Sequence, residues 1–425
     1  MKKDVSKFIL LSLLIYFPLY RDITVIDGIA YQWLFLSSFN LLSFILILIT
    51  DKHKIITLIN FLKKEIYIYS YLFFLVISSI SLINSVNLSV GIVDLTRIYI
   101  VFSTIISVYL LIATINNKQS LYSIGSYFFL IFCLLEVTQV IVPILKSISL
   151  NQFLGRSLNL KGIGYNINVT AFSLTIKIPF LIYLSFSKQK LLKVFSLFLL
   201  FLFLISIIEI QSRASFIALS LILIITISIK SLRSNVLLFP VLLSILFIGF
   251  SGLYNNIQIK RITDVNFVLN SDQSSLNRLR YWSDALNVLK ENPLSGIGIG
   301  SWKTESISFS KEYIREYVVP YHVHNDFLQY GAELGILGGL LYLILFILPL
   351  YSLFKIYYVN KNPFVIILLV SLSVILIDSF FNFPRERALI MSYYSIIIGV
   401  LLYIKNTVEI KNSWKVLHSF MRSFL

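Results

Sequence analysis

Two histidines close together are the candidates in this sequence for a general base. His324, followed by Asn325, opens an apolar run, and His322 lies two residues earlier in irregular chain. Imidazole exchanges its proton near neutral pH, so either side chain could act on an attacking hydroxyl group. We favour His324 because it stands at a helix start; the alternative is an interfacial side chain. His53 and His418 lie among lysines and are expected to be solvated.

Small residues follow His324 at helical spacing. In one continuous helix, Gly331, Gly335 and Gly338 would fall within about 40° of His324. Such a stripe lets a neighbouring helix pack closely, and packing alone would explain the glycines. Glu333 points about 180° away from His324, so we expect it to be a buried partner for another group.

Three arginines could bind phosphate groups. Arg213 lies at a tight turn between two apolar runs, where Ser212 could cap the next helix and free backbone N–H groups add positive potential. Snorkelling to the interface explains Arg213 equally well. Arg278 precedes Trp282 by one helical turn, and Arg280 points about 200° round from Arg278. Only one of this pair can face a given ligand.

Ionisable residues also fall inside or beside apolar runs. Asp378 and Lys177 are expected within membrane spans. A charged side chain is costly there, so each of these residues is a candidate functional residue. Arg385 and Arg387 precede the last apolar run, where interfacial anchoring would explain them.

Other motifs have structural explanations. The run Gly296-Ile-Gly298-Ile-Gly300 lacks the strand and acid of a dinucleotide fold, so it predicts a turn that returns the chain to the membrane. Asp94 and Arg97 are spaced to pair with each other on a helix. The sequence contains no Asp-x-Asp pair, His-Glu-x-x-His motif or Walker lysine, so we expect neither a metal nor a cofactor.

Composition places these residues in a membrane. Of 425 residues, 57% are hydrophobic and 13% charged, with a mean hydropathy of +0.86. An average soluble domain is roughly 25% charged, so a soluble enzyme is excluded. The net charge of +16 suits anionic lipid or substrate phosphates, or reflects membrane topology. The single Cys133 excludes a disulfide framework and a cysteine metal site.

The hydropathy pattern predicts an all-α polytopic membrane protein with about 12 transmembrane helices. The first apolar run follows Met-Lys-Lys and lacks a small-residue cleavage site, so it is taken as a retained span. The predicted spans are 8–20, 30–50, 66–84, 97–115, 121–145, 166–186, 192–209, 213–229, 235–253, 324–353, 364–381 and 387–404.

Charge distribution predicts the orientation. The connections that share a side with both termini hold 19 Lys and Arg, and the opposite short connections hold 8, so both termini should be cytoplasmic. One long outer loop, 254–323, separates nine N-terminal spans in 1–253 from three spans and a tail in 324–425. An amphipathic helix near 276–291 should lie against the membrane face, with Leu279, Trp282, Leu286 and Leu289 on its apolar side.

Four segments together resemble the O-antigen ligase and polymerase superfamily. The first is His324-Asn325 followed by Gly335 and Gly338, and the others are Ser212-Arg213, Arg278 to Gly298, and Asp378 to Pro384. The resemblance is dense over about 209–400 and generic before it. It implies a membrane-embedded glycosyltransferase of the GT-C type that is inverting and independent of metal.

The resemblance also implies substrates and roles. The donor would be an undecaprenyl-diphosphate-linked glycan at the periplasmic face of a bacterial inner membrane. Arg213 with Arg278 or Arg280 would bind the diphosphate, and His324 would act on the acceptor hydroxyl, while Asp378, His322 and Asn325 would support the site. Diphosphate is a good leaving group once its charge is offset, and arginine's fork of donors matches phosphate geometry.

Three functions remain open at this point. A ligase would use a lipid A-core sugar as acceptor, while a polymerase or a protein O-oligosaccharyltransferase of the same superfamily would use another lipid-linked repeat unit or a serine. A lipid-linked glycan transporter is the more remote alternative; it predicts inverted repeats and broken helices, which the sequence does not clearly show. The expected partners are the glycan donor, the acceptor and membrane lipids, without nucleic acid or metal.

Overall fold

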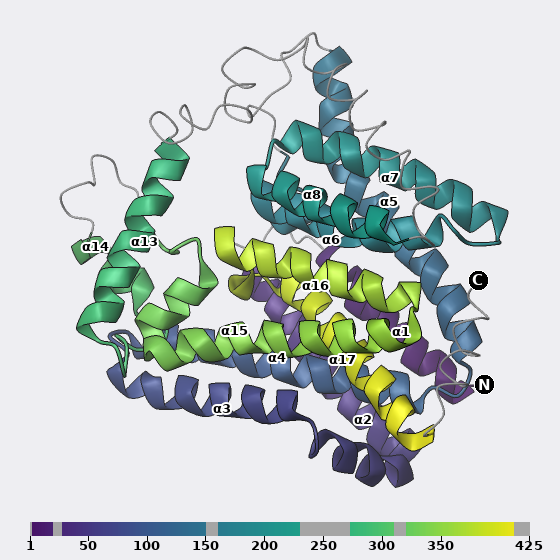
Figure 1. The fold of residues 1–425 in the computed structure, drawn as a ribbon, viewed down its shortest axis with the longest axis horizontal. Coiled ribbons are helices and arrows are strands. Elements are labelled where there is room, and N and C mark those ends of the chain that lie inside the picture. The colour runs from purple at the N-terminus through teal and green to yellow at the C-terminus, as the bar shows by residue number, and fades with distance from the viewer. Residues whose placement is uncertain (1, 20–27, 150–159, 230–272, 310–319, 412–425) are drawn as a thin grey trace.

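The computed structural model describes residues 2–19, 28–149, 160–229, 273–309 and 320–411. All regular structure in these ranges is helical, as the hydropathy pattern predicted (Figure 1). The α-helices are α1 (Lys2–Tyr16), α2 (Gly28–Leu62), α3 (Ile66–Ser81), α4 (Leu88–Thr114), α5 (Lys118–Ser149), α6 (Ile167–Leu184), α7 (Lys190–Ile210), α8 (Arg213–Ser228), α13 (Gln273–Glu291), α14 (Trp302–Phe309), α15 (Asp326–Asn360), α16 (Pro363–Phe381) and α17 (Ala388–Lys411). The 3-10 turns are η1 (Phe17–Leu19), η2 (Leu82–Asn84), η3 (Gly162–Gly164) and η4 (Pro384–Glu386).

Nine helices in the described ranges are long and apolar enough to cross a membrane. Each coincides with one of the twelve spans predicted from sequence. Two further predicted spans, 8–20 and 213–229, overlap α1 and α8, which have 15 and 16 residues. The span predicted at 235–253 lies outside the described residues. The chain is therefore a multi-pass membrane protein that is all-helical in the part described by the structure.

Polar contacts gather at the two ends of the helix bundle. At one end, Lys7 of α1 pairs with Asp51, where α2 kinks, and donates to the carbonyl oxygen of Thr114 at the end of α4. At the other end lie α13 and α14, far from the start of α1 (Figure 1). The contacts of Lys7 join the N-terminal segment to the ends of the second and fourth predicted spans, which the charge distribution assigned to the same side of the membrane.

The helix that begins at Asp326 is broken at Gly335. This glycine has φ 77° and ψ 175°, which lies outside the helical region and is open almost only to glycine. The break frees backbone groups, and the chain after α13 pairs with them: Ile297 N donates to Ala332 O at 3.0 Å, Gly298 N to Glu333 O at 2.9 Å and Ile336 N to Pro293 O at 2.9 Å. The segment 292–298 is thus inserted into the break in α15.

The prediction that Gly331, Gly335 and Gly338 form a stripe along one continuous helix is wrong, because α15 is broken at Gly335. Helical angles cannot be carried across Gly335, and the stripe does not receive a neighbouring membrane helix. The loop carbonyl of Leu294 fills the space beside Gly335, and Leu289 of α13 covers Gly331. The prediction of a turn at Gly296 to Gly300 is confirmed, because all three glycines have positive φ.

The amphipathic helix predicted near 276–291 is confirmed as α13. Ala285 and Val288 are buried against α15, together with Trp302 of α14. Leu279 and Leu286, on the apolar side that the sequence assigned to the membrane face, are 47% and 42% exposed on the protein surface. That this apolar side lies against the membrane stays a prediction.

Candidate functional site

His324 and Asn325 form the entry to α15. Asn325 is the N-cap, and its side-chain oxygen accepts a hydrogen bond from Leu328 N at 3.0 Å. His324 precedes the cap with φ 59°, a left-handed conformation that is uncommon outside glycine. Its ring is directed toward Tyr281 of α13 and Phe383, with ring centroids 6.4 Å and 5.0 Å away. The local turn therefore aims the imidazole at Tyr281 and Phe383, at the end of the bundle where α13 lies.

His322 belongs to the same aromatic group. Its ring stacks on Phe383 with centroids 4.1 Å apart and planes 17° from parallel. The sequence placed His322 in irregular chain outside a helix start, and its contact with Phe383 comes from the distant segment after α16. Nδ1 of His322 and Nδ1 of His324 are both buried without a hydrogen-bond partner among the described residues.

Arg278 of α13 is linked to Asp378 of α16 through the side-chain amide of Asn382. Arg278 donates to Asn382 Oδ1 at 3.5 Å, and Asn382 Nδ2 donates to Asp378 Oδ1 at 2.7 Å. Asp378 is 1% exposed, and its second carboxylate oxygen is buried without a hydrogen-bond partner in the described residues. Arg280 is exposed on α13. Of the two arginines, Arg278 is the one that faces the segment carrying Asp378.

Arg213 is the first residue of α8, directly after the tight turn that Gln211 makes with φ 56°. Ser212 occupies the N-cap position, but its side chain forms no capping bond and instead accepts from Ser215 Oγ at 3.1 Å. The predicted cap is therefore wrong. Because α8 packs against α16, Arg213 starts a helix that borders the one carrying Asp378.

The electrostatic setting makes both histidines weak bases. Burial, followed by the nearby positive charge of Arg278, lowers the pKa of His324 to about 3. Burial also lowers the pKa of His322 to about 3, although Glu386 opposes the effect. The proton exchange near neutral pH that is expected of a histidine in water is therefore wrong for both rings, because burial favours their neutral form.

A network of four charged side chains lies beside His322. Lys303 of α14 donates to Asp94 of α4 at 2.9 Å and to Glu386 of η4 at 3.2 Å, and Arg97 contacts both acids. The predicted pairing of Asp94 with Arg97 is confirmed at 2.9 Å. Burial by itself raises the pKa of Glu386. The positive charges of Lys303 and Arg97 outweigh this effect and hold the pKa well below its usual value. The network joins α14, α4 and η4.

Arg385 and Arg387 are buried, so interfacial anchoring does not explain them. Arg385 is 6% exposed, pairs with Glu333 at 2.9 Å and lies 4.2 Å from the ring centre of Tyr330. The expectation that Glu333 is a buried partner is confirmed. Arg387 lies over the ring of Phe383 at 5.0 Å. Both arginines stabilise the turn that leads from α16 to α17.

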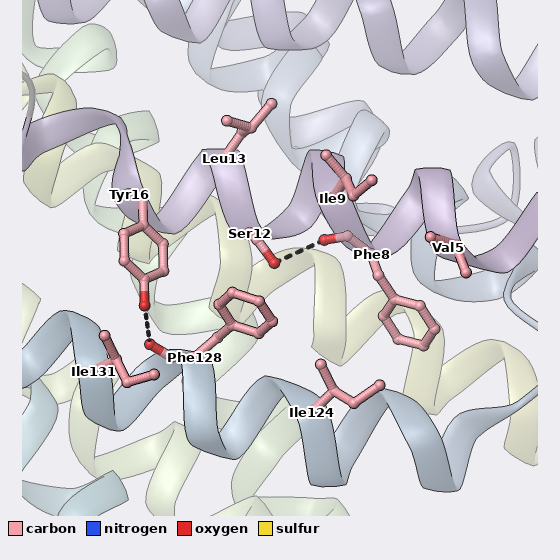
Figure 2. Close-up of a pocket in the computed structure, with 9 residues that line it drawn as sticks. All are labelled: Val5, Phe8, Ile9, Ser12, Leu13, Tyr16, Ile124, Phe128 and Ile131. Atoms are coloured by element: carbon pink, nitrogen blue, oxygen red, sulfur yellow. Dashed lines mark hydrogen bonds between the residues drawn. The ribbon is translucent and has the colours of Figure 1, made fainter.

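Two other features lie apart from the cluster formed by Arg278, His322, His324, Asp378 and Phe383. Lys177 forms a buried ion pair with Glu136 at 2.7 Å, which explains its position in a predicted span. A cavity of about 610 Å³ lies between α1 and α5, lined by apolar side chains and by Ser12 and Tyr16 (Figure 2). Tyr16 closes part of it by donating to Phe128 O at 2.7 Å. This lining suits hydrocarbon and lacks charge for a diphosphate.

Some residues of the cluster were not predicted from sequence as site residues. Asn382 and Phe383 lie in a quoted motif but received no role, and Lys303, Glu386 and Tyr281 were not considered. The available signal was the group of polar residues between α16 and α17, which includes Asn382, Arg385, Glu386 and Arg387. Their contacts join positions more than 40 residues apart, which periodicity within one helix does not report.

The arrangement defines a membrane protein with a polar, aromatic-walled cluster at one end of its helix bundle. The described residues include no group of three or more His, Cys, Asp or Glu side chains that could hold a metal ion. The cluster presents a guanidinium, a buried carboxylate and a neutral imidazole, which suits binding of an anion beside a proton acceptor.

Residues 198–343 match the family model described as O-Antigen ligase. This match supports membership of the O-antigen ligase and polymerase superfamily, as the sequence motifs predicted. The matched range contains Arg213, Arg278 and His324 and ends before Asp378. Proteins of this family are glycosyltransferase-like ligases and polymerases, which supports an enzyme that acts on lipid-linked glycan. No curated protein matches the chain.

Proposed function

We propose that this protein is an O-antigen ligase-like glycosyltransferase, which moves a glycan from undecaprenyl diphosphate to an acceptor hydroxyl at the periplasmic face of the inner membrane. The observation that carries the proposal is the meeting of three segments at one end of the bundle. Arg278 from α13, His324 from the entry to α15 and Asp378 from α16 are linked through Asn382 and by charge. A donor diphosphate next to a proton acceptor is what this reaction needs.

In the proposed mechanism, Arg278 and Arg213 bind the diphosphate and offset the charge of the leaving group. His324 accepts the proton of the acceptor hydroxyl as its oxygen attacks the anomeric carbon, and the bond to the diphosphate breaks on the opposite face, which inverts the configuration. The lipid diphosphate bond is already activated, so the proposed reaction uses neither nucleotide nor metal ion. Asp378 is proposed to support Arg278 through Asn382.

The test is transfer of a lipid-linked glycan to purified acceptor by protein in detergent. His324→Ala should reduce turnover by about 10²-fold or more while donor binding is retained, because general base catalysis contributes roughly 10²–10⁴-fold. His322→Ala is the matched control and should reduce turnover much less, because His322 is not proposed to accept the proton of the acceptor hydroxyl. Full activity in His324→Ala with loss in His322→Ala would assign the base to His322.

The same preparation separates the alternatives. Transfer that survives EDTA is expected, and a loss restored by magnesium would show a metal requirement. Deletion of the gene in its own host should leave long lipid-linked chains if the protein is a ligase and single repeats if it is a polymerase. Lipid-linked glycan that crosses the membrane without any transfer would favour a transporter.

A further inference from the structure

We propose that Phe383 is the positioning residue that orients the imidazole of His324. This inference rests on the proposed role of His324 as the base. A catalytic base usually needs a partner that fixes its ring, and that partner is most often a hydrogen-bond acceptor. Here the Nδ1 atom of His324 is buried without a hydrogen-bond partner in the described part of the chain. Packing against neighbouring aromatic rings can therefore orient the imidazole of His324 in place of a hydrogen bond.

Phe383 is placed to supply this packing. Its ring meets the imidazole of His324 edge to face, with centroids 5.0 Å apart and planes 75° from parallel. Tyr281 lies nearly parallel to His324 on α13, at 6.4 Å. Phe383 would limit tilt of the imidazole, and Tyr281 would limit its rotation out of the plane. Such aromatic pairs favour particular geometries because the ring edge is positive and its face is negative.

Phe383 is itself held firmly, which a positioning residue requires. It is 5% exposed, stacks on His322 at 4.1 Å and carries the guanidinium of Arg387 over its ring at 5.0 Å. The turn η4 follows it directly and is fixed by Glu386, which bonds Lys303 and Arg97.

The experiment compares Phe383→Leu with Phe383→Tyr in the transfer assay. Loss of the ring should lower kcat by about 10-fold to 10²-fold with little change in donor KM, because small misplacement of a reacting group slows chemistry without weakening the diphosphate contacts. Phe383→Tyr keeps the ring and should restore most of kcat. Phe380→Leu is the matched control, since Phe380 packs on Phe327 at 4.5 Å and its effect on kcat should be small.

A double variant tests whether Phe383 acts through His324. Phe383→Leu added to His324→Ala should cause no further loss, and a multiplicative loss would overturn the inference. Wild-type kcat in Phe383→Leu would overturn it too, while full activity in His324→Ala would instead refute the proposed base. Thermal unfolding in detergent checks each preparation, and if Phe383→Leu does not fold, Phe383→Met replaces it in every comparison.

Discussion

His324 stands in an environment that keeps it neutral rather than half protonated. Burial and Arg278 both disfavour the imidazolium form. A general base with a low pKa is always available near pH 7 but has a small drive to take a proton. A bound diphosphate would offset Arg278, so donor binding should raise the pKa of His324 and strengthen the base when it is needed. If the proposed roles hold, donor binding and base strength are therefore expected to be coupled.

This coupling predicts an unusual pH dependence. The kcat/KM of an enzyme reports pKa values of its free form, so the acid limb caused by protonation of His324 should lie well below pH 6.5. As pH falls the base stays neutral until its lowered pKa is approached. The acid limb of kcat should lie at higher pH, because the donor offsets Arg278. The measurement is initial rate against pH at low and saturating donor. An acid limb of kcat/KM near pH 6.5, lost in His324→Ala, would contradict the lowered pKa.

At the scale of elements, the site depends on how α13 is attached to the broken helix α15. The loop after α13 uses backbone groups freed at Gly335, and α13 covers Gly331. This attachment sets the position of Arg278 and Tyr281 relative to His324. Sequence periodicity predicted both helices but not the break, because the glycines fit a continuous helical stripe as well as an interrupted one.

Two glycines of α15 should respond in opposite ways to alanine. Gly335→Ala should lower the free energy of unfolding by about 1–3 kcal/mol, because its φ of 77° strains a residue with a side chain and its Cβ would meet the Leu294 carbonyl. Gly331→Ala should be neutral or slightly stabilising, because its Cβ would lie 3.5 Å from Leu289, an ordinary contact, and alanine favours helix. Thermal unfolding in detergent compares them. Equal effects would show that the break does not control stability.

At the scale of the whole molecule, much of the fold could be predicted and part of the site could not. Apolar runs of about 20 residues identified nine spans because a membrane span leaves a strong one-dimensional signal. Arg278 and His324 were recognised from their types and their motif. The partners of Arg385, Phe383 and Lys303 were missed, since these contacts join residues from distant helices and depend on how the bundle closes.

Orientation in the membrane is the remaining whole-molecule prediction, and the single cysteine makes it directly testable. Cys133 is buried, so the natural chain should react poorly with a membrane-impermeant maleimide. His53 and Ser283 are exposed residues on α2 and α13. The excess of Lys and Arg predicts that His53 is cytoplasmic and Ser283 periplasmic. In spheroplasts, Ser283→Cys should be labelled at once, whereas His53→Cys should be labelled only after lysis. The reverse pattern would place Arg278 and His324 on the cytoplasmic side and would require a donor presented there.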